Sequence, residues 1–265
     1  MNIRYGFIGG LHRSGTSLLT RCLAAHPDAS SFGMTSVWED EGQHLQDVLL
    51  PARALGGPGR FAHHAAAVGP KVSAVVADGL RARLLSTWGP LWDGASPVRL
   101  SKSPPNLLRG PLLQQIFPGS VLLVMRRHPI AVALATQQMS RRHRRLDLID
   151  LIDHWLIAHE AFEQQRAGLG SVVVIEHSDL VSRPSPTLAA AFSALHLEPV
   201  FPPERIVDTD AKYRDQWRSL TSSRFRKSGL LGALDARESR SRSLGYSLEG
   251  FAHWSSPVVS SSSMR

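Results

Sequence analysis

Four short apolar β runs separated by helical stretches constrain this chain more than any other feature. The β runs cover residues 4–9, 98–101, 120–125 and 171–175. Apolar residues recur at helical spacing over residues 15–26, 71–88, 106–117, 130–142, 146–166 and 186–196. Strands that alternate with helices predict a three-layer α/β fold, with a central parallel sheet and helices on both faces. Ligands of such sheets bind beyond the carboxyl ends of the strands.

The length and composition fit one globular domain. Of the 265 residues, 43% are hydrophobic and 20% charged, which excludes a disordered or fibrous chain. We expect a single domain over residues 1–254 and a flexible serine-rich tail over residues 255–265. The single cysteine, Cys22, excludes a disulfide framework and a cysteine-rich zinc site. No apolar run reaches the roughly 18 residues of a membrane helix, so we expect a cytoplasmic protein without stable membrane insertion.

The charge is strongly basic. Arginine and lysine total 30 against 22 acids, which gives a net charge of +8. Arginine binds phosphate and sulfate through its planar fork, so the bias favours an anionic ligand, although a GC-rich genome produces the same bias. Basic clusters over residues 126–145 and 212–242 are typical of polyanion binding. Neither contains interleaved aromatic residues or a recognition motif, and we predict no nucleic-acid partner.

The first β run leads into a glycine-containing turn, Gly10-Leu11-His12-Arg13-Ser14-Gly15-Thr16-Ser17. Glycines let the backbone wrap closely around an anion, and the following helix directs free N–H groups at it. Arg13 adds a full positive charge, and Thr16 and Ser17 add hydroxyl donors. The pattern predicts an anion site, and a strand–helix turn without a ligand is the alternative.

The same turn is P-loop-like but departs from a Walker A loop at one position. Gly10 and Gly15 have the Walker spacing, yet Thr16 replaces the lysine that contacts the β and γ phosphates. The cation, Arg13, comes earlier in the turn. This arrangement suits a donor with a shorter and less charged tail than a triphosphate.

Leu11-His12-Arg13-Ser14-Gly15-Thr16-Ser17 resembles the 5′-phosphosulfate loop of sulfotransferases that use 3′-phosphoadenosine 5′-phosphosulfate (PAPS). The continuation through His26-Pro27-Asp28 is also similar. The resemblance implies a P-loop-like α/β fold, PAPS as co-substrate, no required metal, and donor binding by Arg13, Ser14, Gly15, Thr16 and Ser17.

A second basic turn, Arg126-Arg127-His128-Pro129, follows the strand over residues 120–125. An arginine at the end of a central strand can reach a ligand held by the first turn. The segment resembles the 3′-phosphate motif of the same family, which implies that Arg127 binds the 3′-phosphate. Many members have a serine eight residues later. Here that position is Ala135, so we expect Thr136 to supply the hydroxyl or the contact to be absent.

Three further segments resemble the family. Lys102-Ser103-Pro104-Pro105 is similar to a lysine loop, which implies that Lys102 lies near the bridging oxygen of the donor; Pro104 stands where cytosolic members have a catalytic histidine. His177-Ser178-Asp179-Leu180 occupies the place of a segment whose ring lies by the adenine. Arg226-Lys227-Ser228-Gly229 is a weak match to the C-terminal donor-binding loop, which implies a role for Arg226 and Lys227.

Sulfuryl transfer to an alcohol needs a base near the acceptor oxygen and cations on the leaving group. Arg13 and Lys102 supply cations without a metal. The candidate bases are His12, Glu39, Glu41 and His44. Members with a carboxylate base carry it shortly after the His-Pro-Asp stretch. We prefer Glu41 because Gly42 beside it allows a tight turn. Acids that cap a surface helix are the alternative interpretation of Glu39 and Glu41, and His12 is expected to orient the loop or the acceptor.

Three functions are compatible with these residues. The first is sulfuryl transfer from PAPS to a hydroxyl of a small molecule, sugar or lipid. The second is a P-loop small-molecule kinase that uses ATP–Mg²⁺, against which the missing lysine argues. The third is a non-catalytic polyanion-binding protein that depends on the arginine clusters.

Overall fold

A five-stranded parallel sheet forms the centre of the computed structural model, which describes residues 3–201, 205–222 and 224–253 but not the side chains of residues 224–228 and 231. Its strands are β1 (Arg4–Gly10), β2 (Ala29–Ser31), β3 (Val98–Lys102), β4 (Val121–Arg126) and β5 (Ser171–Glu176). They lie in the order β2-β3-β1-β4-β5. Because all pairs are parallel, the carboxyl ends of β1 and β4 are neighbours at one edge.

Alternate side chains of the central strands enter two different cores. Phe7 of β1 and Val124 of β4 pack on one face, whereas Ile8 and Leu123 pack on the other. All four are buried, so both faces of the sheet are covered. Two-sided burial explains why the β runs read as almost continuous apolar stretches.

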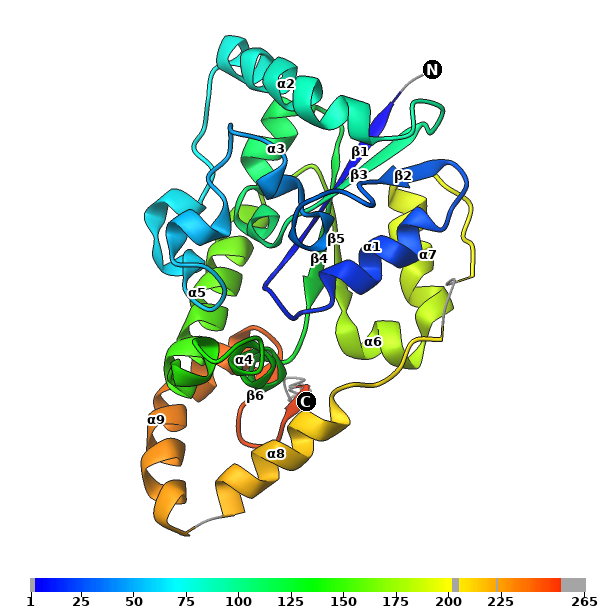
Figure 1. The fold of residues 1–265 in the computed structure, drawn as a ribbon. Helices are drawn as coiled ribbons and strands as arrows, with labels where there is room; N and C mark the ends of the chain where they lie inside the picture. The colour runs from blue at the N-terminus through cyan, green and yellow to red at the C-terminus, as the bar shows by residue number, and fades with distance from the viewer. Residues whose placement is uncertain (1–2, 202–204, 223, 254–265) are drawn as a thin grey trace, which may run out of the picture.

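Helices cover both faces of the sheet (Figure 1). On one face lie α1 (Thr16–Ala24), α6 (His177–Ser182) and α7 (Pro184–Ala194). On the other lie α2 (Ala74–Trp88), α3 (Gly110–Ile116), α4 (Pro129–Gln137) and α5 (Leu148–Arg166). This is the three-layer α/β arrangement that the sequence predicted.

Short 3-10 turns replace regular helix between several of these elements. They are Trp38–Asp40, Gly42–His44, Ala52–Leu55, Phe61–His63, Ala65–Ala67, Gly89–Leu91, Pro104–Leu108 and His143–Arg145. The helix expected over residues 106–117 is divided in two, with Arg109 between the 3-10 turn and α3, because Pro111 fits only a first helical turn. The helix expected over residues 130–142 ends at Gln137.

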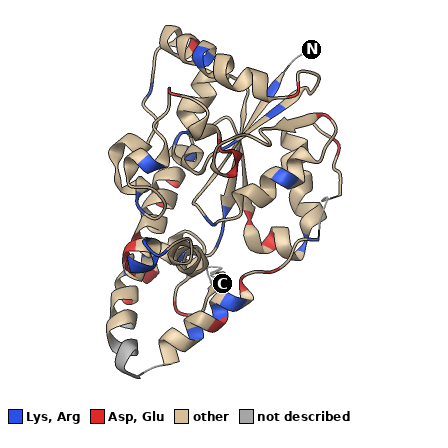
Figure 2. Cartoon of the chain, in the orientation of Figure 1, with Lys and Arg blue, Asp and Glu red and all other residues tan. Residues whose placement is uncertain are grey.

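The C-terminal part packs beside α4 and α5. It contains α8 (Ala211–Ser222), α9 (Arg224–Ser243) and the antiparallel pair β6 (Tyr246–Ser247) and β7 (Ala252–His253). Arg237 and Arg240 of α9 pair with Asp153 and Glu160 of α5, with Nε–O distances of 2.8 and 2.7 Å. In Figure 2 basic and acidic residues are interleaved over helices and loops. The tail predicted over residues 255–265 lies outside the described residues.

No helix in the described part of the chain is long and apolar enough to span a bilayer.

Replacing Gly9 by alanine should destabilise the fold. A Cβ on Gly9 would lie 2.4 Å from the backbone nitrogen of Leu107, which cannot give way as a side chain can. We expect Gly9→Ala to lower the free energy of unfolding by about 2 kcal/mol or more, measured by urea denaturation.

Gly79→Ala is the matched control, because a Cβ at this position in α2 meets nothing within 4 Å. It should leave stability unchanged or raise it by up to about 1 kcal/mol, since alanine favours helix over glycine. Equal effects of the two substitutions would contradict the close approach at Gly9.

Candidate functional site

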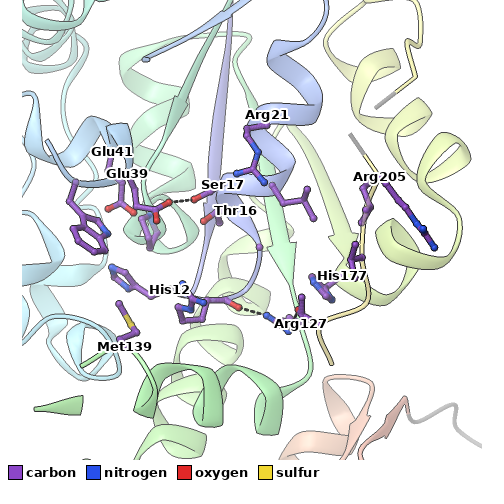
Figure 3. A pocket seen from close by; sticks show the side chains of 18 residues that line it. His12, Thr16, Ser17, Arg21, Glu39, Glu41, Arg127, Met139, His177 and Arg205 are labelled. Carbon is purple, nitrogen blue, oxygen red and sulfur yellow. Dashed lines mark hydrogen bonds between the residues drawn. The ribbon is translucent and has the colours of Figure 1, made fainter. Parts of the chain in front are cut away.

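A cavity of about 420 Å³ opens at the carboxyl ends of β1 and β4. The turn after β1, the start of α1, the segment over residues 38–41, the turn after β4 and the segment over residues 205–209 surround it (Figure 3). Among the residues predicted from the sequence, the following line this one cavity: His12, Arg13, Gly15, Thr16, Ser17, Glu39, Glu41, Arg127 and His177.

The turn after β1 has a backbone that suits an anion. Gly10, Arg13 and Gly15 have φ angles of 152°, 70° and 107°, which lie in the left-handed range. A Cβ on Gly10 would lie 2.5 Å from the carbonyl oxygen of Met125 at the end of β4, so glycine is required there. Gly15 caps α1 without a side-chain contact, and the first N–H groups of α1 are left for a ligand.

Arg127 joins the two turns. Its Nη1 donates a hydrogen bond to the carbonyl oxygen of Arg13 at 2.8 Å, drawn as a dashed line in Figure 3. Arg127 is buried, with 6% of its surface exposed, whereas Arg13 is exposed. Both line the same cavity, so a single ligand can contact both arginines.

Arg127 also forms an ion pair with Asp210, the residue before α8. Nε of Arg127 lies 2.8 Å from Oδ1 of Asp210, and Nη2 lies 2.9 Å from Oγ1 of Thr209. Nδ1 of His177 lies 3.4 Å from Oδ2 of Asp210. Burial opposes ionisation of Asp210, but contact with His177 and the charge of Arg127 outweigh it and lower the pKa of Asp210 from 3.8 to about 2.

Lys102 lies between the two candidate carboxylates. Its Nζ is 3.2 Å from Oε1 of Glu41 and 3.8 Å from Oε2 of Glu39. Glu39 is 40% exposed and accepts a hydrogen bond from Oγ of Ser17 at 2.6 Å. Glu41 is buried and also accepts a hydrogen bond from Gln43. Lys102 itself lines a smaller adjoining cavity of about 180 Å³.

The environment of Glu41 makes it a stronger base than an ordinary glutamate. Burial raises the pKa of Glu41 above 4.5, and the charge of Lys102 offsets part of this effect. Gly42 lies in a 3-10 turn, in which the backbone N–H of His44 donates to the carbonyl oxygen of Glu41 at 2.9 Å, so the chain does turn tightly beside Glu41. A Cβ on Gly42 would lie 2.5 Å from Oγ of Ser101. The carbonyl oxygen of Gly42 accepts a hydrogen bond from Nε1 of Trp88 at 3.1 Å. Close packing therefore fixes the backbone beside Glu41.

Two consecutive residues before Glu41 have left-handed backbone conformations. The φ angles of Glu39 and Asp40 are 55° and 50°, which are uncommon for residues other than glycine. Asp40 Oδ1 accepts a hydrogen bond from the backbone N–H of Thr35 at 2.7 Å, and Glu39 is held by Ser17. These contacts aim both glutamates at the cavity.

The two candidate histidines are neutral at neutral pH. Burial, assisted by the charge of Lys102, lowers the pKa of His12 to about 3. The Nδ1 atom of His12 is buried and has no hydrogen-bond partner among the described residues. His44 has Nε2 3.8 Å from Oε2 of Glu41, and burial together with nearby Arg53 lowers its pKa.

Some predicted residues lie elsewhere. Thr136 does not line the cavity; its hydroxyl donates to the carbonyl oxygen of Val132 within α4 at 2.7 Å. Arg226 and Lys227 belong to helix α9 rather than to a loop, and their side chains lie outside those described. Ser14 is buried beneath the turn, and its Oγ has no partner among the described residues.

Several residues that line the cavity were not predicted from the sequence. Trp38, 70% exposed, lines the cavity next to Glu39 in the sequence, and Ile206, Val207 and Thr209 also line it. In Figure 3 Met139 lies beside His12, and Arg205 lies on the side of His177. The position of Trp38 directly before Glu39 in the sequence was a usable signal for it. Asp210 had none, because 83 residues separate it from Arg127.

No metal cluster is present within the described ranges, since no three His, Cys, Asp or Glu side chains are placed to share an ion.

The chain is similar to known sulfotransferases. The profile of the sulfotransferase family matches residues 7–203. A sulfotransferase from Alicyclobacillus acidocaldarius has a TM-score of 0.52 at 16% identity, over 88% of this chain and 97% of its own, and shares the fold. The sulfotransferase domain from the curacin biosynthetic pathway has a TM-score of 0.49 at 15% identity, over 77% and 76%. A sulfotransferase from Mycobacterium tuberculosis has a TM-score of 0.48 at 17% identity, over 80% of this chain and 71% of its own. No curated protein sequence matches significantly.

Protonating Asp210 should weaken the fold. Its pKa is about 2 in the folded chain against 3.8 ordinarily, so the carboxylate stabilises the fold above pH 4 and loses this effect as the pH falls toward 2. We expect Asp210→Asn to cost about 2 kcal/mol at pH 7 and about half of that at pH 3, measured by urea unfolding.

Asp215→Asn is the control, because Asp215 is exposed and pairs with Arg218 on α8. Its effect should be small at both pH values. A penalty for Asp210→Asn that does not change with pH would show that the ion pair is not its cause.

Proposed function

The chain belongs to the sulfotransferase family, and we propose that it transfers the sulfuryl group of PAPS to a hydroxyl group of a small-molecule, sugar or lipid acceptor. One observation carries the proposal: Arg13 and Arg127, from the ends of two neighbouring strands, line a single cavity that also contains the buried Glu41. PAPS has anionic groups at both its 5′ and 3′ positions, and two arginines on one cavity match them.

The turn after β1 would hold the phosphosulfate. The N–H groups at the start of α1, the guanidinium of Arg13 and the hydroxyls of Thr16 and Ser17 are the donors available there. Arg127 would bind the 3′-phosphate, and the ring of His177, on the same side of the cavity in Figure 3, would lie by the adenine.

Glu41 would accept the proton of the acceptor hydroxyl. The acceptor oxygen then forms a bond to sulfur, the bond from sulfur to the bridging oxygen breaks, and adenosine 3′,5′-bisphosphate leaves with the negative charge. Arg13 stabilises that charge. Lys102 contacts both Glu41 and Glu39, offsets part of the effect of burial on the pKa of Glu41, and would supply a second cation. No step needs a metal ion.

The acceptor end of the cavity is partly apolar. Trp38 and Met139 line the cavity together with the neutral ring of His12. A flat or apolar acceptor that presents one hydroxyl to Glu41 fits these surfaces.

Ligand-dependent thermal stability tests the donor. Adenosine 3′,5′-bisphosphate at about 100 times its Kd should raise the melting temperature by several degrees, roughly 5 °C, whereas ATP–Mg²⁺ should not. Arg13→Ala should abolish the shift, and Arg218→Ala, which alters an exposed residue of α8, should keep it. A larger shift with ATP–Mg²⁺ would favour a kinase, and no shift at millimolar bisphosphate would exclude the proposed donor.

The pH dependence of turnover tests the base. A panel of alcohols is incubated with labelled PAPS, and sulfated product is measured by mass. Turnover should fall as the pH drops through the pKa of Glu41, above 4.5, because only the carboxylate accepts a proton. Glu41→Gln should reduce kcat by about 100-fold or more, remove this acid limb and leave bisphosphate binding intact.

Glu39→Gln is the control for that experiment, since Glu39 shares Lys102 but is half-exposed. Its kcat should fall by less than about tenfold with the acid limb retained. The assignment of Glu41 fails if Glu39→Gln has the larger effect.

A further inference from the structure

The guanidinium of Arg127 is almost completely occupied by the protein's own acceptors. Arginine has five N–H donors. Nε and Nη2 of Arg127 donate to Oδ1 of Asp210, the former at 2.8 Å. Nη2 also donates to Oγ1 of Thr209 at 2.9 Å, and Nη1 donates to the carbonyl oxygen of Arg13 at 2.8 Å. Within the described residues, one N–H of Nη1 is left without a partner.

Asp210 is held firmly against Arg127. Its side chain is 10% exposed, and its backbone N–H donates to Oδ1 of Asp208 at 2.7 Å. Its second carboxylate oxygen lies 3.4 Å from Nδ1 of His177. The carboxylate is ionised at neutral pH, because its pKa is about 2. Arg127 therefore already has an anionic partner at the position where the proposed donor places its 3′-phosphate.

A phosphate cannot form a bidentate contact with Arg127 while these partners are in place. A bidentate contact needs two parallel N–H groups, and both Nε and Nη2 are used by Asp210 and Thr209. A phosphate monoester also carries a charge of about −1.5 to −2 at neutral pH, which repels an adjacent carboxylate. Bidentate binding of a 3′-phosphate therefore requires Asp210 to separate from Arg127.

The segment that carries Asp210 forms part of the cavity wall. Residues 205–210 connect toward α8 without helix or strand structure, and Arg205, Ile206, Val207 and Thr209 line the cavity. A displacement of this segment would therefore change the shape of the cavity wall and break the contact between Asp210 and Arg127.

We propose that Asp210 is a specificity-determining residue that competes with the 3′-phosphate of the nucleotide for Arg127, so that only a nucleotide bearing this phosphate displaces residues 209 and 210. This inference rests on the proposed donor. A nucleotide without the 3′-phosphate leaves the Arg127–Asp210 pair in place and gains nothing when Asp210 loses its charge.

Calorimetric titration with two matched nucleotides tests the inference. PAPS and adenosine 5′-phosphosulfate differ only in the 3′-phosphate, and no acceptor is added, so no turnover occurs. Asp210→Asn should bind PAPS about tenfold more tightly than the wild type, because the competing charge is gone. Its affinity for adenosine 5′-phosphosulfate should change by less than about twofold.

Two further variants complete the experiment. Asp215→Asn makes the same change in net charge on the exposed side of α8 and should alter neither affinity. Thr209→Val removes one competing acceptor without a charge change, so it should tighten PAPS alone by about two- to threefold. It tests the inference independently if Asp210→Asn fails to fold.

The outcomes separate the two proposals. If the wild type binds neither nucleotide, the proposed donor is wrong and the inference falls with it. If the wild type binds PAPS but Asp210→Asn binds it equally or more weakly, Asp210 orients Arg127 for the phosphate and the competition is disproved. Equal tightening of both nucleotides would also overturn the inference, because it would show a general charge effect.

Discussion

The hydrogen bond from Arg127 to the carbonyl oxygen of Arg13 ties the turn after β4 to the turn after β1. It forms because β1 and β4 pair in parallel with Gly10 opposite Met125, so both turns leave the sheet at the same level. Gly10 allows the approach, since any side chain there would collide with the Met125 carbonyl. The spacing of the two arginines is thus set by the sheet, which is more rigid than the loops that carry them.

Buried cations around the cavity each have a carboxylate. Lys102 contacts Glu41 and Arg127 contacts Asp210. The partly buried Arg126, which lies outside the cavity lining, likewise contacts Glu176 with an Nε–Oε1 distance of 2.6 Å. Burial of a charge is costly unless a partner compensates it. The basic excess of the whole chain is therefore not concentrated inside the site. Arg13 is different, because it is exposed and has no ion-pair partner among the described residues, so it can meet an incoming anion directly.

The sequence predicted the parts of the fold that depend on local pattern. Four of the five strands were predicted, whereas β2 was missed because its three residues, Ala29–Ser31, are too short to show a period. The turn after β1 was predicted because its glycines and its arginine are adjacent in sequence.

Features that depend on tertiary contacts were not predictable. The Arg127–Asp210 pair joins residues 83 positions apart, and nothing near either residue indicates the other. Arg226 and Lys227 resemble a family loop in sequence, but in the structure these residues belong to helix α9. The preference for Glu41 over Glu39 was based on the turn that Gly42 allows. The structure supports this preference for another reason, the burial of Glu41.

The hydroxyl of Ser17 belongs to both halves of the cavity. It stands on the first turn of α1, where the phosphosulfate is proposed to bind, and it donates its proton to Glu39 on the opposite wall. A hydroxyl has one proton to donate, so an anion that claims it releases Glu39, whose backbone is already in an unfavourable conformation. An anion bound at the start of α1 would therefore remove one of the contacts that hold Glu39 in the cavity wall.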